Sequence, residues 1–478
     1  MTSVFKKQYV LSSYRLELPD MQEIKISEGY LYVHQKLNLT LCQTKDASRA
    51  IVLGNAFCAD EEGKSIEKDI SLFCKQDLRE ATKYWTGRWV LICEDELITD
   101  ACGLMSAFYT KEDSGWLVSS SLAVLAQITN KPIDKMVNSY GLNWQILPHS
   151  RINGVRTLLC TQKLVFSKTE IEADFSPFVK DYREKSTEEK CKAVSNILVC
   201  ACKNINAFSG KKTVVALTGG KDSRLTFSAL LKSGVPFSAY TAEHKNISSS
   251  DKTIPAKLAK HFGIEHKYIR KGKFSVEKFE DYKHFTCGNS DDADAQFYAC
   301  GQFSSFDKDT ILLRSGIFEA GQRYARSYTT PDIEGFVCGM LSYYPDLKNS
   351  QEQKNAFSEW KKYVIQNPIN SIDIRDRFYI EQRVGGWAAA IEQSLDINEF
   401  TSIQIANCAE LVSILLSCNE EERKQLALSY ETIKLLKPET LRLAINKVTF
   451  YDKFKRISNI LRHPIKKYKN FVNKRNSL

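Results

Sequence analysis

The stretch TGGKDS, from Thr218 to Ser223, has the residue types of a phosphate-binding turn. It follows the apolar run VVAL and precedes a segment with helical periodicity, SRLTFSALLKSG. Glycines let the backbone approach a ligand closely and adopt positive φ. The N–H groups of such a turn, with those at the start of the next helix, bind phosphate oxygens. We therefore expect a nucleotide site made of Leu217, Thr218, Gly219, Gly220 and Ser223, with Ser223 capping the helix or binding phosphate itself.

Asp222 places a carboxylate in this turn, and a carboxylate beside phosphate oxygens is repelled unless a cation lies between them. Mg²⁺ in proteins is usually held by one or two carboxylates together with phosphate oxygens. We therefore predict that Asp222 binds Mg²⁺. The alternative is a tight turn and helix cap without a ligand. Two other nucleotide motifs are absent, because SGKKT at residues 209–213 precedes the apolar run and no G-x-G-x-x-G occurs.

Alternating strands and helices surround the turn. The segment EEKCKAVSNILVCACKNINAF has helical periodicity, and TVVALTGG, PFSAYTA, HKYI and TILLRSG are short apolar segments typical of strands. Helices ending at Gly234 and Gly263 separate the first three of these strands. This alternation predicts a parallel sheet with helices on both faces, in which ligands bind at the carboxyl ends of the strands. From Arg375 to about Lys447 we predict mainly helix.

The first third of the chain has a different pattern. Segments such as EGYLYVHQ, ASRAIVLGNAF, GRWVLICEDELITDACG, SAFYTKEDSGWLVSSS and RTLLCTQKLVFSK are rich in β-branched and aromatic residues and are bounded by turn formers. They predict an α+β or sheet-on-sheet unit, with SLAVLAQITN as a helix. We expect a boundary near Ser176, with domains at 1–175 and 176–447 and a basic tail at 448–478.

Composition limits the classes of protein. The chain of 478 residues is 43% hydrophobic and 26% charged, with a formal net charge of +10. This balance is typical of a soluble globular protein. We find no apolar run of the ~18 residues that a membrane span needs and no secretory signal, so we expect a cytoplasmic protein. Fourteen scattered cysteines without ligand spacing predict reduced thiols.

The basic tail, YDKFKRISNILRHPIKKYKNFVNKRNSL, interleaves Lys and Arg with Ile, Leu, Tyr and Phe. It could contact anionic lipid or nucleic acid. A solvated extension is the alternative, because Pro464 interrupts a single amphipathic helix. We expect no DNA partner, and a partner protein or a homo-oligomer stays open.

The string LTGGKDSR resembles the pyrophosphate loop, usually S-G-G-x-D-S, of the ATP-pyrophosphatase (PP-loop) superfamily. Within it, the chain resembles the branch of asparagine synthetase and β-lactam synthetase, to about Lys447. WTGRWVLICEDELITDACGLMSAFYTKEDSGWLVSSSLAVLA is similar to the core of class II glutaminases. The resemblance implies a glutaminase-like (Ntn-type) β-rich sandwich followed by an adenine nucleotide α-hydrolase-like synthetase domain that uses ATP and Mg²⁺.

One departure from the family concerns the N-terminus. Class II glutaminases use a cysteine that removal of Met1 exposes, whereas position 2 here is Thr2 and the first cysteine is Cys42. A thiolate attacks carboxamides far more readily than an unactivated hydroxyl. We therefore expect no glutamine hydrolysis, and a first domain that acts as a scaffold or a recognition surface.

A second departure is the segment RSGIFEAGQRY. Asparagine synthetases have roughly S-G-x-G-S-D-E here, with a carboxylate that completes the Mg²⁺ site. Ser315 and Gly316 match the start of that loop, and Glu319 is the only acid left, so the resemblance assigns Glu319 to metal binding. The alternative is a glutamate favoured at the start of a helix by the helix dipole.

The resemblance also suggests residues around the substrates. FYIEQRVGGWAAAIEQSLDINEF resembles the wall of the acyl pocket, where Arg383 and Trp387 face the substrate or simply pack. The branch uses a late lysine to stabilise charge, and Lys447 is the best-placed candidate, with a solvated lysine as the alternative. Tyr379 and Glu381 could supply a base for an amine, or lie on a helix surface.

Weaker assignments complete the set. Thr241 and Ala242 are placed to meet adenine, and Asp251 caps a helix or contacts ribose. The run NSDDADAQ could bind an amine or form a solvated loop; its acids are Asp291, Asp292 and Asp294. Three histidines lack metal-ligand spacing and are expected on the surface, namely His244, His261 and His266.

Together these features predict an ATP- and Mg²⁺-dependent synthetase that adenylates a small-molecule or peptide carboxylate and passes the acyl group to an amine. Two alternatives stay open. One is a sulfur-transfer enzyme acting on tRNA, against which the missing catalytic cysteine pair counts. The other is a non-catalytic ATP-binding or assembly protein, in which the altered loop at Glu319 marks loss of function.

Overall fold

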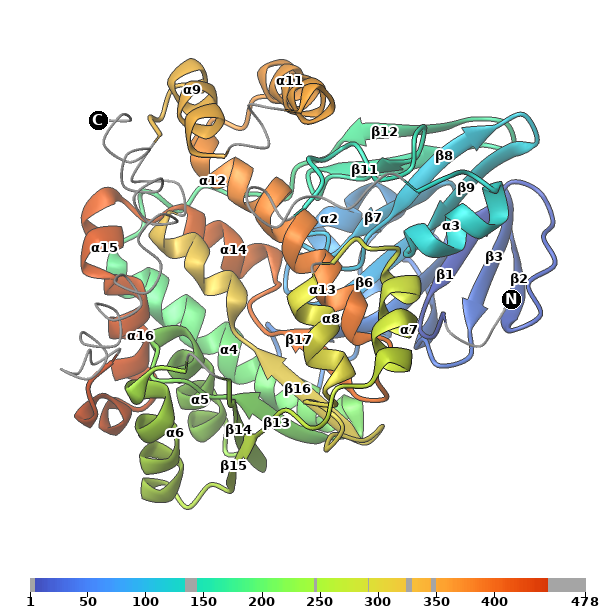
Figure 1. Cartoon of the computed structure of the whole chain (residues 1–478). Helices are drawn as coiled ribbons and strands as arrows, with labels where there is room; N and C mark the ends of the chain where they lie inside the picture. The colour runs from blue at the N-terminus through green and yellow to red at the C-terminus, as the bar shows by residue number, and fades with distance from the viewer. Residues whose placement is uncertain are drawn as a thin grey trace.

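Two six-stranded antiparallel sheets make up the first third of the chain (Figure 1). The computed structural model describes residues 5–133, 144–244, 247–290, 292–323, 329–344 and 350–445. One sheet has the order β10-β8-β9-β1-β3-β2, with β1 at Tyr9–Ser12, β2 at Met21–Ile26, β3 at Gly29–His34, β8 at Phe108–Glu112, β9 at Gly115–Ser119 and β10 at Arg156–Thr157. The other has the order β12-β11-β7-β6-β5-β4, with β4 at Leu39–Gln43, β5 at Arg49–Cys58, β6 at Trp85–Cys93, β7 at Glu96–Thr99, β11 at Gln162–Phe166 and β12 at Ile171–Phe175.

Side-chain alternation packs these two sheets face to face. In β6, Val90 and Ile92 join the core between the sheets, whereas Leu91 and Cys93 face the opposite way. Strand side chains alternate with a period of two, so one strand serves both layers. The outer layer is closed by α1 at Ile66–Ile70 and α2 at Leu78–Ala81, with the short η1 at Lys75–Asp77.

A parallel sheet of five strands follows. Its order is β15-β14-β13-β16-β17, with β13 at Lys212–Ala216, β14 at Phe237–Ala242, β15 at His266–Ile269, β16 at Thr310–Arg314 and β17 at Thr401–Gln404. The chain moves outward from β13 to β15 on one side and then crosses to β16 on the other side. This reversal makes the carboxyl ends of β13 and β16 the topological switch point, where open α/β sheets bind ligands.

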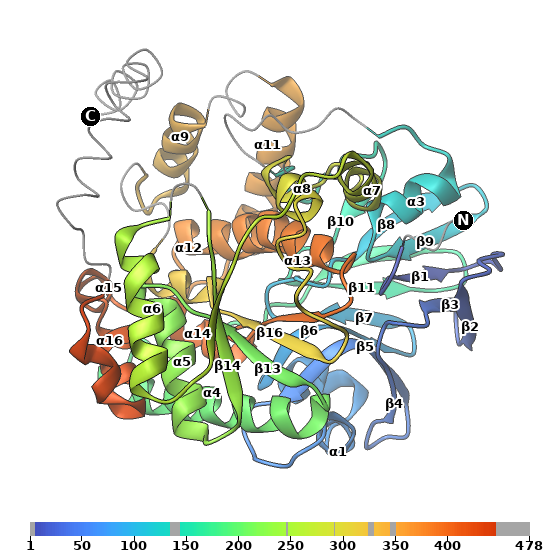
Figure 2. The same cartoon turned by 60° about the horizontal axis from the view of Figure 1, so that its bottom comes forward.

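Helices and aromatic side chains cover the two faces of this sheet. Val215 joins a core with helices on one face, and its neighbour Val214 packs on the other face with Tyr240, Phe306 and Phe400. The helices of the first face are α4 at Thr187–Ser209, α5 at Lys221–Ser233, α14 at Ala409–Leu416 and α16 at Ala427–Leu436 (Figure 2). That core also contains residues from the first third of the chain, so the two parts share buried surface.

The other elements form the rim of the molecule. They are α3 at Leu122–Thr129, α6 at Ser249–His261, α7 at Val276–Thr286, α8 at Asp292–Ala299, η2 at Gly316–Gln322, α9 at Ile333–Tyr343, α11 at Gln351–Gln366, α12 at Ile374–Phe378, η3 at Tyr379–Ala388, α13 at Ala389–Leu395, α15 at Glu420–Gln425 and η4 at Pro438–Arg442. Of these, η3 is a π-helix, a form that often occurs at functional sites.

The predicted fold class, α/β plus α+β with a helical C-terminal part, is confirmed. The expected boundary near Ser176 falls between β12 and α4, whereas residues 446–478, which include the basic tail, lie outside the described residues. One element was missed, because β17 lies inside the region predicted as mainly helical. Its four residues, TSIQ, are too few to show a strand period.

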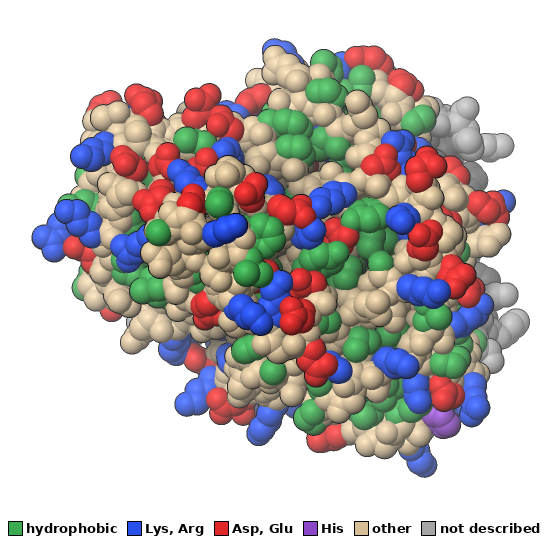
Figure 3. Space-filling view, turned by 180° about the vertical axis from the view of Figure 1, so that it is seen from behind, with side chains coloured by type: hydrophobic (Ala, Val, Ile, Leu, Met, Phe, Trp, Pro, Cys, Tyr) green, Lys and Arg blue, Asp and Glu red, His purple; other side chains and the backbone are tan. Residues whose placement is uncertain are grey.

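Two expectations from composition meet the structure directly. All fourteen cysteines are free, as predicted. Among the described helices, none combines the length and apolar character that crossing a membrane requires. On the face shown in Figure 3, basic and acidic side chains are interspersed and hydrophobic side chains form separate small groups.

Candidate nucleotide and metal site

The TGGKDS turn joins the carboxyl end of β13 to the first turn of α5, at the switch point of the sheet. Ser223 lies in that first turn and folds back, so that its Oγ accepts a hydrogen bond from the Thr218 N–H at 3.1 Å. The Gly220 N–H donates to Thr218 Oγ1 at 3.1 Å. Protein oxygens thus cover these amides, and a phosphate would bind them by replacing hydroxyl oxygens of the same turn.

Gly219 is required for a different reason from the one expected. Neither glycine of the turn has positive φ, and Gly220 is extended at φ −80° and ψ 167°. A Cβ added at Gly219 would lie 2.2 Å from Ser250 Oγ in α6. The prediction of positive φ is therefore wrong, and the glycine serves the close approach of the next helix.

Asp251 connects the turn to α6. Its Oδ1 accepts a hydrogen bond from the Gly219 N–H at 2.6 Å, and its N–H donates to Ser248 Oγ, the cap of α6. A carboxylate oxygen therefore accepts the hydrogen bond of one amide of the turn in this structure. This contact was not predicted, because Asp251 and Gly219 are 32 residues apart.

Thr241 and His266 lie just behind the turn. The buried Thr241 hydroxyl donates to the Leu217 carbonyl at 2.7 Å, so it accepts from His266 Nε2 at 2.9 Å. Burial lowers the pKa of His266. The expected surface position is wrong for this half-buried ring, although His244 and His261 are exposed. The Thr241 side chain is engaged inside the protein, which leaves its backbone for any contact with adenine.

Asp222 and Glu319 come together at the switch point. Asp222 lies in the first turn of α5 after β13, and Glu319 lies in η2 after β16. Glu319 is exposed to solvent, yet crowding by the surrounding protein raises its pKa, and the charge of Asp222 adds to the rise. Arg383 and Lys221 oppose it. Two carboxylates that repel each other in one place are suited to a divalent cation between them.

Lys221 is a residue of this site that the sequence did not reveal. Its side chain is only 6% exposed and forms an ion pair with Asp222. A lysine in a turn is usually solvated, so the residue type did not indicate a place in the site.

In the part of the chain that the structure describes, no group of three metal-ligating side chains occurs. The acids fit a Mg²⁺ ion whose other ligands are phosphate oxygens and water.

Ser315 and Gly316 are tied into the protein framework. Ser315 Oγ lies 2.8 Å from Thr226 Oγ1 of α5, and the Gly316 N–H donates to Gln404 Oε1 at 2.7 Å. Gln404 in turn donates to the buried Glu392 at 2.8 Å. These bonds fix the loop after β16 against α5 and β17, which holds Glu319 in register with Asp222.

The π-helix η3 brings an arginine to the same site. The Arg383 guanidinium lies 3.6 Å from the ring centre of Trp387 and 5.3 Å from that of Trp144. Its positive charge also acts to lower the pKa of Glu319, which places it near that acid. Tyr379 also belongs here, since burial and then Glu319 raise its pKa well above the usual value. Stacking on rings keeps a guanidinium rigid and only partly hydrated.

Glu381 is not available as a base. It is fully buried and accepts hydrogen bonds from Thr161 at 2.6 Å, Trp360 at 2.7 Å and Arg377 at 2.9 Å.

Of the predicted acidic run NSDDADAQ, Asp294 accepts a hydrogen bond from Ser290 at 3.1 Å. Other predicted positions lie outside the described residues, namely Thr2, Asp291, the side chain of Asp292 and Lys447.

Arg224 is a second residue that was missed. It is fully buried in α5 and donates to the carbonyls of Thr440 at 3.1 Å and Ala444 at 3.3 Å, and to that of Leu443. Burial lowers its pKa to about 10. The helix that starts at the TGGKDS turn therefore also holds the chain just before Lys447.

No protein-family model and no curated protein matches the sequence. NMN synthetase from Francisella tularensis is similar at 16% identity over 42% of this chain and 95% of that chain, with a TM-score of 0.22. A structure described as the allosteric regulatory enzyme of purine biosynthesis is 8% identical over 60% and 73%, with a TM-score of 0.24. Glutamine-dependent NAD⁺ synthetase from Acinetobacter baumannii, in complex with adenosine diphosphate, is 12% identical over 59% and 60%, with a TM-score of 0.21. Matches at these TM-scores do not establish shared activity.

Proposed function

We propose that this protein is an ATP- and Mg²⁺-dependent synthetase of the asparagine synthetase and β-lactam synthetase kind, which joins a carboxylate to an amine. The observation that carries the proposal is the convergence of two acids at the switch point. Asp222 and Glu319 come from different strands, and the charge of one raises the pKa of the other beside a glycine turn. This arrangement suits a metal-bridged triphosphate.

The reaction has two steps. An oxygen of the substrate carboxylate attacks the α-phosphorus of ATP, the bond to the β-phosphate oxygen breaks, and pyrophosphate leaves an acyl-adenylate. The amine nitrogen then attacks the acyl carbon, AMP leaves with the electron pair of the C–O bond, and the amine loses a proton. Bound Mg²⁺ supplies charge neutralisation on the phosphate oxygens.

The protein residues divide the remaining work. The amides of the TGGKDS turn hold the departing pyrophosphate. The Lys221 ammonium pairs with Asp222 in this structure and binds a phosphate oxygen once Mg²⁺ takes its place beside that carboxylate. Arg383, held between Trp144 and Trp387, is positioned to bind a carboxylate of the acyl substrate. Lys447 stabilises charge during both steps, and Arg224 anchors the segment that leads to it.

The amine is free ammonia, a separate substrate or an amine within the same molecule. Position 2 is Thr2, so no thiolate is present there to release ammonia from glutamine. Peptide maturation, natural-product assembly and sugar-acid amidation are all compatible with this chemistry.

A second candidate is ATP binding without turnover. Hydrogen bonds within the protein already occupy two amides of the loops, which favours this candidate. The Gly219 N–H donates to Asp251 and the Gly316 N–H donates to Gln404. Tight binding of ATP, with no acid that releases pyrophosphate, would identify this activity.

The direct test is exchange of labelled pyrophosphate into ATP with a panel of carboxylic acids. Exchange that depends on one acid and on Mg²⁺, with AMP formed only when an amine is added, supports adenylation. Pyrophosphate exchange with no acid dependence, or ADP and phosphate as products, would rule out the proposed chemistry.

We also expect an acid limb in the pH profile that depends on metal. Because the pKa of Glu319 is raised, its carboxylate gains a proton at a higher pH than an ordinary glutamate and then cannot bind Mg²⁺. Exchange should fall as the pH drops through this raised value, and more Mg²⁺ should move the limb to lower pH. The pH profile measured at two Mg²⁺ concentrations checks this. A limb that stays in place would contradict the assignment of Glu319.

A further inference from the structure

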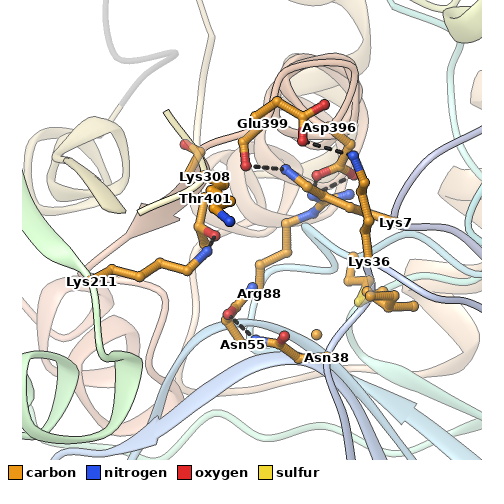
Figure 4. A pocket seen from close by; sticks show the side chains of 14 residues that line it. Lys7, Lys36, Asn38, Asn55, Arg88, Lys211, Lys308, Asp396, Glu399 and Thr401 are labelled. Atoms are coloured by element: carbon orange, nitrogen blue, oxygen red, sulfur yellow. Dashed lines mark hydrogen bonds and ion pairs between the residues drawn. The ribbon is translucent and has the colours of Figure 1, made fainter. Parts of the chain in front are cut away.

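A cationic cavity lies at the junction of the antiparallel and parallel sheets, away from the TGGKDS turn. Its volume of about 220 Å³ holds about seven water molecules at ~30 Å³ each. Five cationic side chains line it against two acidic ones: Lys7, Lys36, Arg88, Lys211 and Lys308 against Asp396 and Glu399 (Figure 4).

The two acids are already neutralised. Asp396 pairs with Arg88 at 2.8 Å, and Glu399 pairs with Lys36 and Lys6, each at 2.8 Å. Among the described residues, the other lysines of the cavity form no ion pair. Positive charge is therefore in excess where the two sheets meet.

Lys7 and Lys211 are held in place by hydrogen bonds, and neither forms an ion pair within the described part of the chain. Lys7 donates to the carbonyls of Asn398 at 2.9 Å and Phe400 at 2.6 Å, and Lys211 donates to Thr401 Oγ1 at 2.7 Å. Burial lowers the pKa of Lys7 to about 8; Asp396 and Glu399 oppose this fall, and Lys211 and Arg88 add to it. Burial also lowers the pKa of Lys211. Crowded ammonium groups of this kind are stabilised by an anion.

Arg88 supplies a directional donor in the cavity. It extends from β6 and is only 8% exposed, and its Nε donates to the Leu104 carbonyl at 3.1 Å. In Figure 4, Lys211 and Lys7 approach from opposite sides of Arg88. Asn38 and Asn55, which hydrogen-bond each other at 2.8 Å, add neutral polar groups to the wall. The lining therefore offers both charge and hydrogen bonds to oxygen atoms.

The cavity is distinct from the nucleotide site. Lys211 precedes β13, Lys308 precedes β16 and Thr401 begins β17, so the cavity lies at the amino ends of the parallel strands. The TGGKDS turn lies at the carboxyl ends. The step along β13 from Lys211 to Leu217 spans about 20 Å.

We propose that this cavity is a binding site for a small multivalent oxyanion, bearing carboxylate or phosphate groups, that clamps the antiparallel and parallel parts together. The site draws Lys7 and Arg88 from one part and Lys211 and Lys308 from the other. It is independent of the proposed synthetase activity.

Calorimetric titration of the full chain tests the proposal, in low salt and without Mg²⁺ or nucleotide. The probes are citrate for a carboxylate ligand and inorganic phosphate for a phosphate ligand. We expect saturable binding of at least one probe below about 1 mM, which also identifies the ligand class. Lys211→Gln and the exposed Lys308→Gln should each weaken binding, the former by about tenfold or more.

Two controls locate the binding. Lys168→Gln removes an exposed lysine in the hairpin turn between β11 and β12 and should leave affinity within about twofold. Ser223→Ala changes the opposite end of β13 and should also leave it unchanged. No saturable binding of either probe would overturn the proposal, as would equal affinity in wild type and both lysine variants, or loss of binding only in Ser223→Ala.

Discussion

Asp222→Asn should reduce acid-dependent pyrophosphate exchange by at least about 10²–10³-fold, which is the loss typical when one preorganised charge contact to a reacting group is removed. The side chain keeps its shape but loses the charge that holds a cation against the phosphates. It also loses the ion pair with Lys221, whose ammonium is then left without its partner. Exchange rates at saturating ATP and Mg²⁺ measure the effect.

The control for this change is Asp113→Asn. Asp113 is exposed in the turn between β8 and β9, remote in the fold from the switch point. It should keep full exchange and unfold at the temperature of the wild type, whereas Asp222→Asn should unfold at a lower temperature because Lys221 loses its partner. Exchange is therefore compared well below both unfolding temperatures. An Asp222→Asn protein that exchanges pyrophosphate at the normal rate would remove Asp222 from the metal site.

Glu319→Gln should weaken Mg²⁺ binding by about 10–100-fold while leaving the metal-free protein equally or more stable. The ionised carboxylate is disfavoured in the folded protein by crowding and by Asp222, as its raised pKa shows. A protein that contains an acid whose pKa is raised by folding becomes less stable as the pH rises through the raised pKa. A neutral amide in place of the acid removes this loss of stability at neutral pH. A merely structural glutamate would give the opposite result, with a lower Tm and unchanged metal affinity.

Thermal melts with and without Mg²⁺ and ATP separate these outcomes. Wild type should gain stability from the ligands, and Glu319→Gln should lose most of that gain. Glu17→Gln, an exposed carboxylate ahead of β2, is the matched control and should keep it. If Glu319→Gln gained as much as wild type from Mg²⁺ and ATP, Asp222 would have to act with another acid.

The place of the candidate nucleotide turn in the fold could be predicted because its parts are contiguous. Strand, glycines, Asp222 and helix follow one another in the sequence, and their order alone places them at the carboxyl end of a parallel strand. Pairing with Glu319 required the family resemblance, because nothing in the sequence shows that β13 and β16 are neighbours.

The rest of the site depends on contacts that the sequence does not encode locally. Arg224 binds a carbonyl 216 residues away, and Lys221 is buried in the folded chain although it lies in a turn whose residue types suggest exposure. The cationic cavity draws its lysines from segments that each look like solvated surface. Charged side chains are usually exposed, so nothing in these segments marks their lysines as the lining of a cavity.

The most direct test is a crystal structure with Mg²⁺ and a non-hydrolysable ATP analogue. We expect the triphosphate against the amides of Thr218–Ser223, with one metal ion in contact with Asp222 and Glu319. Density for the nucleotide in any other place, with Lys221 still paired to Asp222, would contradict the assignment of this turn as the ATP site.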